Sequence, residues 1–250
     1  MSRAIAARTV IVVPDAEALA EAAAARLLAR VSPATGRKAV VLSGGATPQK
    51  LFRLLAGEPW RSAIPWQDIH WFWGDERFVA ETDPRSNFGI AKDLLFDRVP
   101  APRMNIHPIP TDVKDPDRAA ALYAAELARF YGAEALDDAR PLFDLVLLGV
   151  GPDGHTASLF PGSTALEETR QWVVGVAEAG WEPFIPRVSQ TFPALASCRE
   201  MLFLVAGAVK RDVLARVFSG SDVPAARADA NGELVWLIDE AANPGGGGRG

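Results

Sequence analysis

The chain has 250 residues, 49% of them hydrophobic, and a formal net charge of -5 at pH 7. This length and apolar content are enough to bury a large core, in one α/β domain or in two small ones. The acidic balance argues against a broad surface for nucleic acid or anionic membrane, so an anionic ligand must be met by specific residues. The single cysteine, Cys198, excludes a disulfide framework and a cysteine zinc site, and we expect it in the core of a protein from a reducing compartment.

The two ends of the sequence show no targeting or membrane signal. No apolar run reaches the roughly 18 residues that a membrane span requires. Asp15, Glu17 and Glu21 interrupt the alanine-rich start, where a signal peptide would be uniformly apolar. We therefore predict a cytoplasmic protein with one α/β domain over residues 1–241. The glycine-rich end has nothing to bury, so we expect a disordered tail over residues 242–250.

The first part of the chain alternates strand and helix patterns. Residues 9–13 (TVIVV) form a β-branched run, and Asp15 can cap the alanine-rich helical pattern that continues to about residue 31. Residues 38–42 (KAVVL) repeat the strand pattern and end in SGGATP, where Thr47 can cap a helix whose first position is Pro48. These are two successive β-α units.

The alternation continues through the rest of the sequence. Residues 69–73 (IHWFW) predict a strand with aromatic core side chains that ends at GDER, and residues 87–97 and 115–131 predict helices. Further strands are predicted at residues 143–148, 172–176, 201–205 and 234–238, with a helix at residues 208–218 between the last two. We therefore expect a single doubly wound, mostly parallel sheet with helices on both faces, as in Rossmann-like folds. Ligands of such sheets bind at the carboxyl ends of the strands, where SGG, GDER and GVGPDGH all lie.

Two glycine-rich turns are candidates for binding an anion, and the sequence supports the first more than the second. Gly44 and Gly45 lack Cβ atoms, so the backbone before a helix could approach a phosphate closely, although a simple strand-to-helix turn explains them equally well. Residues 149–154 satisfy G-x-G-x-x-G, but Pro152 removes one N–H and the match follows a late strand. We expect no dinucleotide there, and the sequence has no G-x-S-x-G elbow and no convincing set of metal ligands.

Charged residues and histidines supply the remaining candidates. The chain has three histidines, His70, His107 and His155, and only His155 follows a glycine-rich turn after a strand. The run Asp75-Glu76-Arg77 is an ordinary solvated loop unless other motifs converge on it. The run follows a predicted strand, so we expect it to meet the other motifs at the edge of the sheet where the strands end.

Four stretches occur in a specific order across most of the chain: LSGGATP, WGDERFV, SNFGIAKDLLF and LLGVGPDGHTASLFPG. Together with PRVSQTFPAL around Arg187 and AGAVKRDVL around Lys210, they resemble the 6-phosphogluconolactonase family over about residues 9–240. The resemblance implies the glucosamine-6-phosphate isomerase type of fold. It also implies hydrolysis of 6-phospho-D-glucono-1,5-lactone in the pentose phosphate pathway, without metal or cofactor.

The resemblance also assigns roles to individual residues. Hydrolysis needs a base for water and a positive group near the carbonyl oxygen, which His155 and Arg77 would supply, with Asp153 orienting the imidazole. Asp75 is a further catalytic candidate whose role stays open. The residues expected to bind the substrate phosphate are Ser43, Gly44, Gly45, Thr47, Arg187 and Lys210.

Two alternatives remain beside the lactonase. The related glucosamine-6-phosphate deaminases share the GxDGH turn, but carry a glutamate five residues after the histidine, where this chain has Phe160. A sugar-phosphate-binding regulator without catalysis would keep the pocket but would not need Asp153, His155 and Arg77. The expected partner is a small phosphorylated sugar lactone, with no nucleic acid and no membrane, and the expected assembly is a monomer or a weak homodimer.

Overall fold

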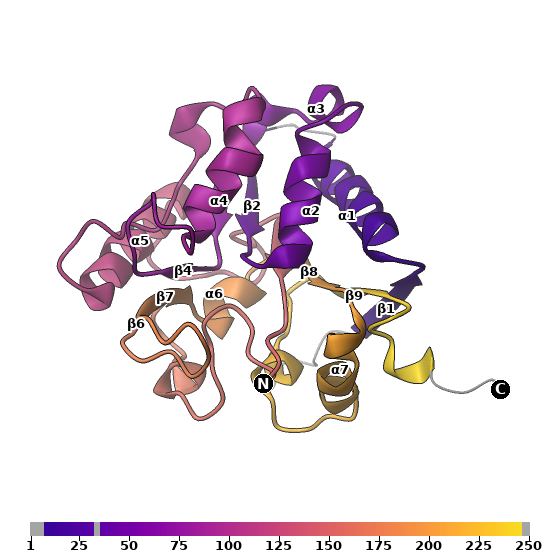
Figure 1. Ribbon diagram of the computed structural model, residues 1–250. Helices are drawn as coiled ribbons and strands as arrows, with labels where there is room; N and C mark the ends of the chain where they lie inside the picture. Colours follow the sequence, from indigo (N-terminus) through magenta and orange to yellow (C-terminus); the bar gives the residue numbers. More distant parts are fainter. Residues whose placement is uncertain (1–7, 33–35, 247–250) are drawn as a thin grey trace.

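Six parallel strands form the central sheet of the protein, in the order β1-β9-β8-β5-β2-β3 (Figure 1). The computed structural model describes residues 8–32 and 36–246. The strands are β1 (Arg8–Val13), β2 (Lys38–Leu42), β3 (Ile69–Trp73), β5 (Leu145–Leu148), β8 (Glu200–Val205) and β9 (Glu233–Asp239). Every neighbouring pair in this sheet is parallel, which confirms the predicted sheet.

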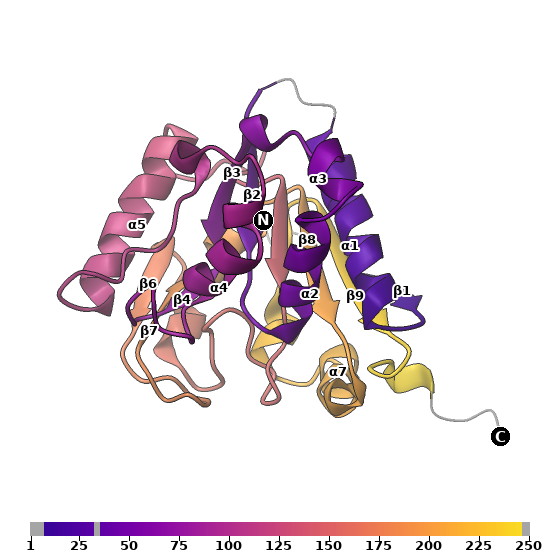
Figure 2. The same cartoon turned by 45° about the horizontal axis from the view of Figure 1, so that its top comes forward.

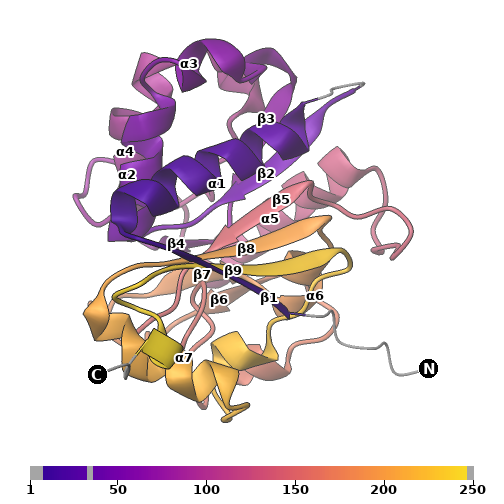
Figure 3. The same cartoon turned by 90° about the vertical axis from the view of Figure 1, so that its right-hand side faces the viewer.

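Helices cover both faces of the sheet, as the doubly wound prediction requires. Figure 3 shows α1 and α2 on one side of the sheet and α7 on the other. The predicted cap Asp15 accepts a hydrogen bond from the Ala18 N–H at 2.8 Å and starts α1. The helices are α1 (Ala16–Val31), α2 (Ala46–Leu55), α3 (Trp60–Ala63), α4 (Asn87–Leu94), α5 (Pro116–Tyr131), α6 (Phe192–Ala196) and α7 (Arg211–Phe218).

Several predicted elements are shorter in the structure. The helix predicted at residues 87–97 ends at Leu94 and gives way to a 3-10 turn at Phe96–Arg98. The helix predicted at residues 208–218 begins as a 3-10 turn at Ala208–Lys210 before α7. The strand predicted at residues 143–148 begins at Leu145, and just before it the Asp144 carboxylate accepts the Ala39 N–H of β2 at 2.9 Å.

A second, antiparallel sheet of three strands was not predicted. It consists of β4 (Asp75–Arg77), β7 (Arg187–Gln190) and β6 (Val173–Val176) in that order. The predicted strand at residues 172–176 belongs to this sheet, which corrects the expectation of one sheet. The charged β4 and the polar β7 have no apolar run that would predict a strand. Helix α5 packs against β6 and β7, and Figure 2 shows it beside this sheet.

The aromatic strand and the lone cysteine are buried as predicted. Trp71, Phe72 and Trp73 are each at most 1% exposed, and Cys198 is fully buried. At the other end of the chain, Ala242 is buried and Pro244–Gly246 form a 3-10 turn. Residues 242–246, which the sequence analysis assigns to the disordered tail, are therefore part of the folded chain, and residues 247–250 lie outside the described residues. None of the described helices is long and apolar enough to cross a membrane.

Two histidines and a glutamate form a hydrogen-bonded row away from the carboxyl ends of the strands. His70 Nδ1 lies 2.9 Å from His107 Nε2, and His107 Nδ1 lies 2.8 Å from a Glu126 carboxylate oxygen. The pKa of His70 is lowered to about 4, mainly by burial and also by the nearby His107 and Arg37, against the opposing effect of Glu126. The pKa of His107 is also lowered, mainly by burial, against the opposing effect of Glu126.

We predict that these histidines make the fold less stable in mild acid. Because their pKa values are lower in the folded state, the unfolded chain takes up protons first as the pH falls below about 6.5. The free energy of unfolding, measured with denaturant, should fall between pH 6.5 and pH 4, and less so in His70→Asn. An identical pH dependence in both proteins would show that His70 does not contribute to it.

Candidate active site

The loops that follow β2, β3, β5 and β8 enclose a cleft of about 380 Å³. The cleft therefore lies at the carboxyl ends of the parallel strands, as predicted. The lining includes every predicted site residue except Asp153, namely Ser43, Gly44, Gly45, Thr47, Asp75, Arg77, His155, Arg187 and Lys210. Asp153 contacts the cleft through His155.

The turn after β2 places a helix start against the cleft. Gly45 is the N-cap of α2 with φ +109°, a conformation that favours glycine. The prediction that Thr47 caps the helix and Pro48 opens it is wrong, because this glycine conformation starts the helix at Ala46. Among the described residues, no side chain caps this helix start. Its first N–H groups therefore face the cleft without a competing acceptor, as an anion site requires.

The turn after β5 orients the imidazole of His155. The Asp153 Oδ1 atom lies 2.5 Å from His155 Nδ1 and also accepts the His155 backbone N–H at 3.1 Å. Burial alone would raise the pKa of Asp153, but these hydrogen bonds from His155 lower it below its ordinary value. An ionised Asp153 can only accept, so Nδ1 carries the proton and the lone pair is at Nε2. The turn thus gives His155 the tautomer that a general base needs.

His155 packs against a glycine and an aromatic ring. The Phe160 ring, which is buried, lies 4.6 Å from the imidazole centroid. A Cβ atom added to Gly151 would lie 2.1 Å from His155 Nδ1 and Cε1. Only glycine at position 151 leaves room for the ring, which is a reason for this glycine that the G-x-G-x-x-G pattern did not reveal.

Two arginines lie directly opposite each other on β4 and β7. Arg77 pairs in register with Arg187, and both line the cleft. The guanidinium of Arg187 is bound by the Ile185 and Pro183 carbonyls, and that of Arg77 by the Arg85 carbonyl. Burial lowers the pKa of Arg187, and the charge of Arg77 lowers it further, while Asp75 and Glu76 act in the opposite direction. Like charges facing each other across a sheet are unfavourable unless an anion lies near both.

The remaining cation enters the cleft from the loop after β8. Lys210 Nζ donates to the Val150 carbonyl at 2.7 Å, and burial lowers the pKa of Lys210. The loop is held at Gly207, whose N–H donates to both carboxylate oxygens of Asp239. An ammonium group uses one donor for Val150 and keeps two for a ligand.

Sequence reasoning missed Ser158 and Asn87 at the site and left the role of Glu76 open. Ser158 Oγ donates to Asp75 Oδ2 at 2.6 Å, while Asn87 lines the cleft and donates from Nδ2 to the Asp75 carbonyl at 2.9 Å. Glu76 is 2% exposed and accepts the N–H groups of the first two residues of α4. Burial raises its pKa to about 7, although hydrogen bonds from the Phe88, Asn87 and Arg77 backbones lower it. Their only sequence signal was membership of the ordered motifs.

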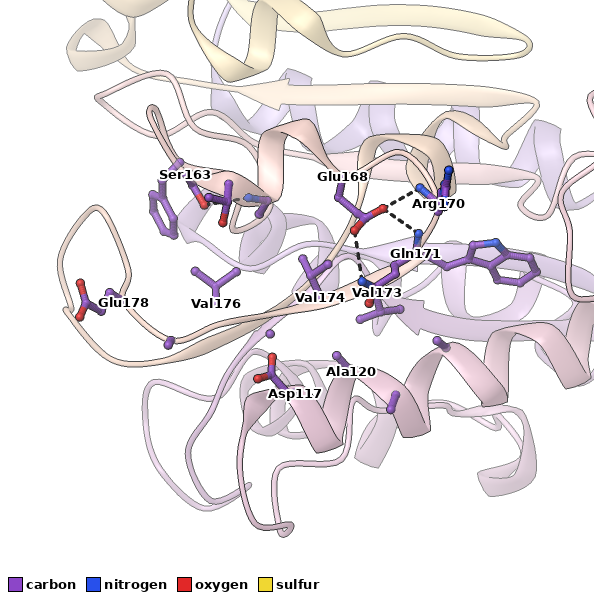
Figure 4. A pocket seen from close by; sticks show the side chains of 18 of the residues that line it. Asp117, Ala120, Ser163, Glu168, Arg170, Gln171, Val173, Val174, Val176 and Glu178 are labelled. Atoms are coloured by element: carbon purple, nitrogen blue, oxygen red, sulfur yellow. Dashed lines mark hydrogen bonds between the residues drawn. The ribbon is translucent and has the colours of Figure 1, made fainter.

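A larger cavity of about 1230 Å³ lies between α5, β6 and residues 160–171. Figure 4 shows Asp117, Glu168 and Glu178 well apart on its lining. The Glu168 carboxylate is occupied by the N–H groups of Arg170 and Gln171. Its described lining contains no histidine and no lysine. We therefore place the chemistry in the smaller cleft, where an oriented base and three cations converge.

Comparisons with known proteins point to one family. Residues 14–236 match the family model described as glucosamine-6-phosphate isomerases/6-phosphogluconolactonase. The chain is 42% identical over 238 residues to a 6-phosphogluconolactonase of Streptomyces coelicolor, covering 91% of this chain and 90% of the relative. It is also 42% identical over 211 residues to that of Synechocystis sp., covering 83% and 84%. The solved 6-phosphogluconolactonase structure of Thermotoga maritima has a TM-score of 0.80 at 28% identity, covering 93% of this chain and all of that one.

We predict that Gly151→Ala lowers kcat by about 10²-fold, because displacement of a catalytic group by about 1 Å has an effect of this size. The added methyl group would push the His155 ring out of its place. Gly149→Ala is the matched control in the same turn, since a Cβ atom there meets nothing within 4 Å. Steady-state kinetics of both variants on a phosphorylated lactone test this. Equal kcat values would show that contact between Gly151 and the ring does not matter.

Proposed function

The chain belongs to the family of glucosamine-6-phosphate isomerases and 6-phosphogluconolactonases, and we propose that it hydrolyses 6-phospho-D-glucono-1,5-lactone to 6-phospho-D-gluconate in the oxidative pentose phosphate pathway. The observation that carries this proposal is His155 in the cleft, oriented through Nδ1 by Asp153. Relatives that carry this name cover most of the chain.

The reaction begins when His155 Nε2 takes a proton from water and the water oxygen bonds to the lactone carbonyl carbon. Negative charge then develops on the carbonyl oxygen, and Arg77 is the cation that we assign to it. The tetrahedral intermediate collapses by breaking the bond to the ring oxygen, which takes the proton back from the imidazolium. The product is the open-chain acid, which is ionised at neutral pH. Asp153 stabilises the imidazolium throughout.

The phosphate would bind at the other polar groups of the cleft. We assign it to the N–H groups at the start of α2, beside Ser43 and Thr47, with Arg187 and Lys210 as the cations. All these groups come from one chain, which supports a site that works in a monomer or in a weak homodimer.

Phe160 separates this proposal from deamination. It occupies the position where the deaminases carry the glutamate of their catalytic relay, and it brings a buried ring against His155 in place of a carboxylate. Among the described residues, the only carboxylate hydrogen-bonded to His155 is that of Asp153. A regulator that merely binds sugar phosphate would not require this oriented imidazole.

We expect the purified protein to hydrolyse the lactone and to release no ammonia from glucosamine 6-phosphate. Lactone opening yields an acid, so a pH indicator follows it, corrected for spontaneous hydrolysis. Ammonia release at a comparable rate would favour the deaminase. Binding of the phosphorylated product without turnover would favour the regulator.

His155→Asn should fold normally and bind 6-phosphogluconate, yet lose about 10²- to 10⁴-fold in kcat, the usual contribution of a positioned base. Asparagine keeps a hydrogen-bonding side chain at the turn but cannot take a proton from water. The measurements are circular dichroism, product binding by calorimetry and the corrected rate of lactone opening. A folded variant with near-normal kcat would remove His155 from the mechanism.

A further inference from the structure

Strand β4 presents its side chains to two different surroundings. Asp75 and Arg77 line the cleft, whereas Glu76 between them does not. This follows from the alternation of side chains along a strand. Glu76 is 2% exposed, so no water or substrate reaches its carboxylate from the cleft. A buried acid beside an active site needs a reason, because burying a charge without partners is costly.

The Glu76 carboxylate is surrounded by donors. It accepts the backbone N–H groups of Arg77, Asn87 and Phe88, each at 2.7 Å, and the Ser86 hydroxyl at 3.2 Å. Two of these N–H groups belong to the first residues of α4, whose start would otherwise leave them unsatisfied. The carboxylate thus joins the backbone of β4 to the start of α4.

The start of α4 in turn contacts the glycine turn after β2, residues 43–45, which we call the anion turn. Asn87 donates from Nδ2 to the Asp75 carbonyl, which fixes the orientation of its amide. Its Oδ1 atom is buried without a hydrogen-bond partner, and a Cβ atom on Gly44 would lie 2.0 Å from it. Asn87 therefore sits between β4 and the glycine turn after β2, and a shift of α4 would move both walls of the cleft.

On the basis of the proposed lactone hydrolysis, we propose that Glu76 is a positioning residue that holds Arg77 in place for the reaction. It does not touch substrate. It acts through the Arg77 backbone, which its carboxylate binds directly, and through the α4 start. The carboxylate also opposes the lowering of the Arg187 pKa.

Glutamine cannot replace this carboxylate. A side-chain amide has one acceptor oxygen, and its NH2 group would face N–H donors that require an acceptor. Glu76→Gln should therefore release part of the β4 and α4 backbone and lower kcat by roughly ten- to hundredfold, because Arg77 loses its place near the developing charge. The KM should change less than kcat, since Arg187 and Lys210, the cations assigned to the phosphate, stand on other elements.

The decisive experiment is a double-variant cycle on kcat. The proteins are wild type, Glu76→Gln, Arg77→Ala and the double variant, assayed on 6-phospho-D-glucono-1,5-lactone. If Glu76 acts through Arg77, the double variant loses little more than Arg77→Ala alone. A general structural role would instead give losses that multiply, and that result would overturn the proposal, as would a folded Glu76→Gln with normal kcat.

Controls separate the possible failures. Glu81→Gln removes an exposed acid from the loop before α4 and should leave kcat and KM unchanged. If Glu76→Gln does not fold by circular dichroism, Ser86→Ala removes one donor to the same carboxylate, and its smaller loss must also vanish in the Arg77→Ala background. If the wild-type protein does not turn over the lactone, the proposed function itself is refuted. If it does, and the Glu76 and Ser86 variants have the same kcat as wild type, only the role of Glu76 is refuted.

Discussion

The parallel pairing of β2, β3, β5 and β8 brings the loops after these strands to one edge of the sheet, and the candidate site depends on this constraint. An antiparallel sheet would send alternate loops to opposite ends. Here four segments that are far apart in the sequence meet. They are the turn after β2, the charged strand β4, the turn with His155 and the loop with Lys210. The same geometry explains why His70 cannot take part. It is the second residue of β3 and lies away from the edge where the cleft forms.

This constraint also explains how much could be predicted from the sequence. Apart from the largely exposed edge strand β1, the strands of the parallel sheet are buried, so each appears as an apolar run, and the edge where their loops meet follows from the topology. The antiparallel sheet lacks that signal, because β4 consists of the three charged residues Asp75–Arg77. Its pairing with β7 depends on contacts between distant segments. The sequence therefore predicted which residues gather, but not that Arg77 faces Arg187 or that Glu76 turns away from them.

Backbone contacts were equally hidden from sequence patterns. Gly44 and Gly151 are needed because a neighbouring side chain, Asn87 or His155, occupies the space of a Cβ atom. A glycine motif is usually read through φ angles or close approach of a ligand. At these two positions the protein itself makes the close approach. The glycines thus allow the cleft walls to pack around the catalytic groups before any substrate binds, which is the preorganisation that electrostatic catalysis requires.

The charges of the cleft follow from the same packing. The chain as a whole is acidic, yet Arg77, Arg187 and Lys210 all line one small cleft. Acids lie near two of them, because Asp75 and Glu76 act on Arg187 while Asp153 acts on Lys210. These carboxylates reduce the cost of burying the cations, but their oxygens are engaged by Ser158, by His155 and by the backbone of α4. Three cations in one small cleft favour a dianionic ligand such as a phosphate, because it supplies more charge than the acids already present.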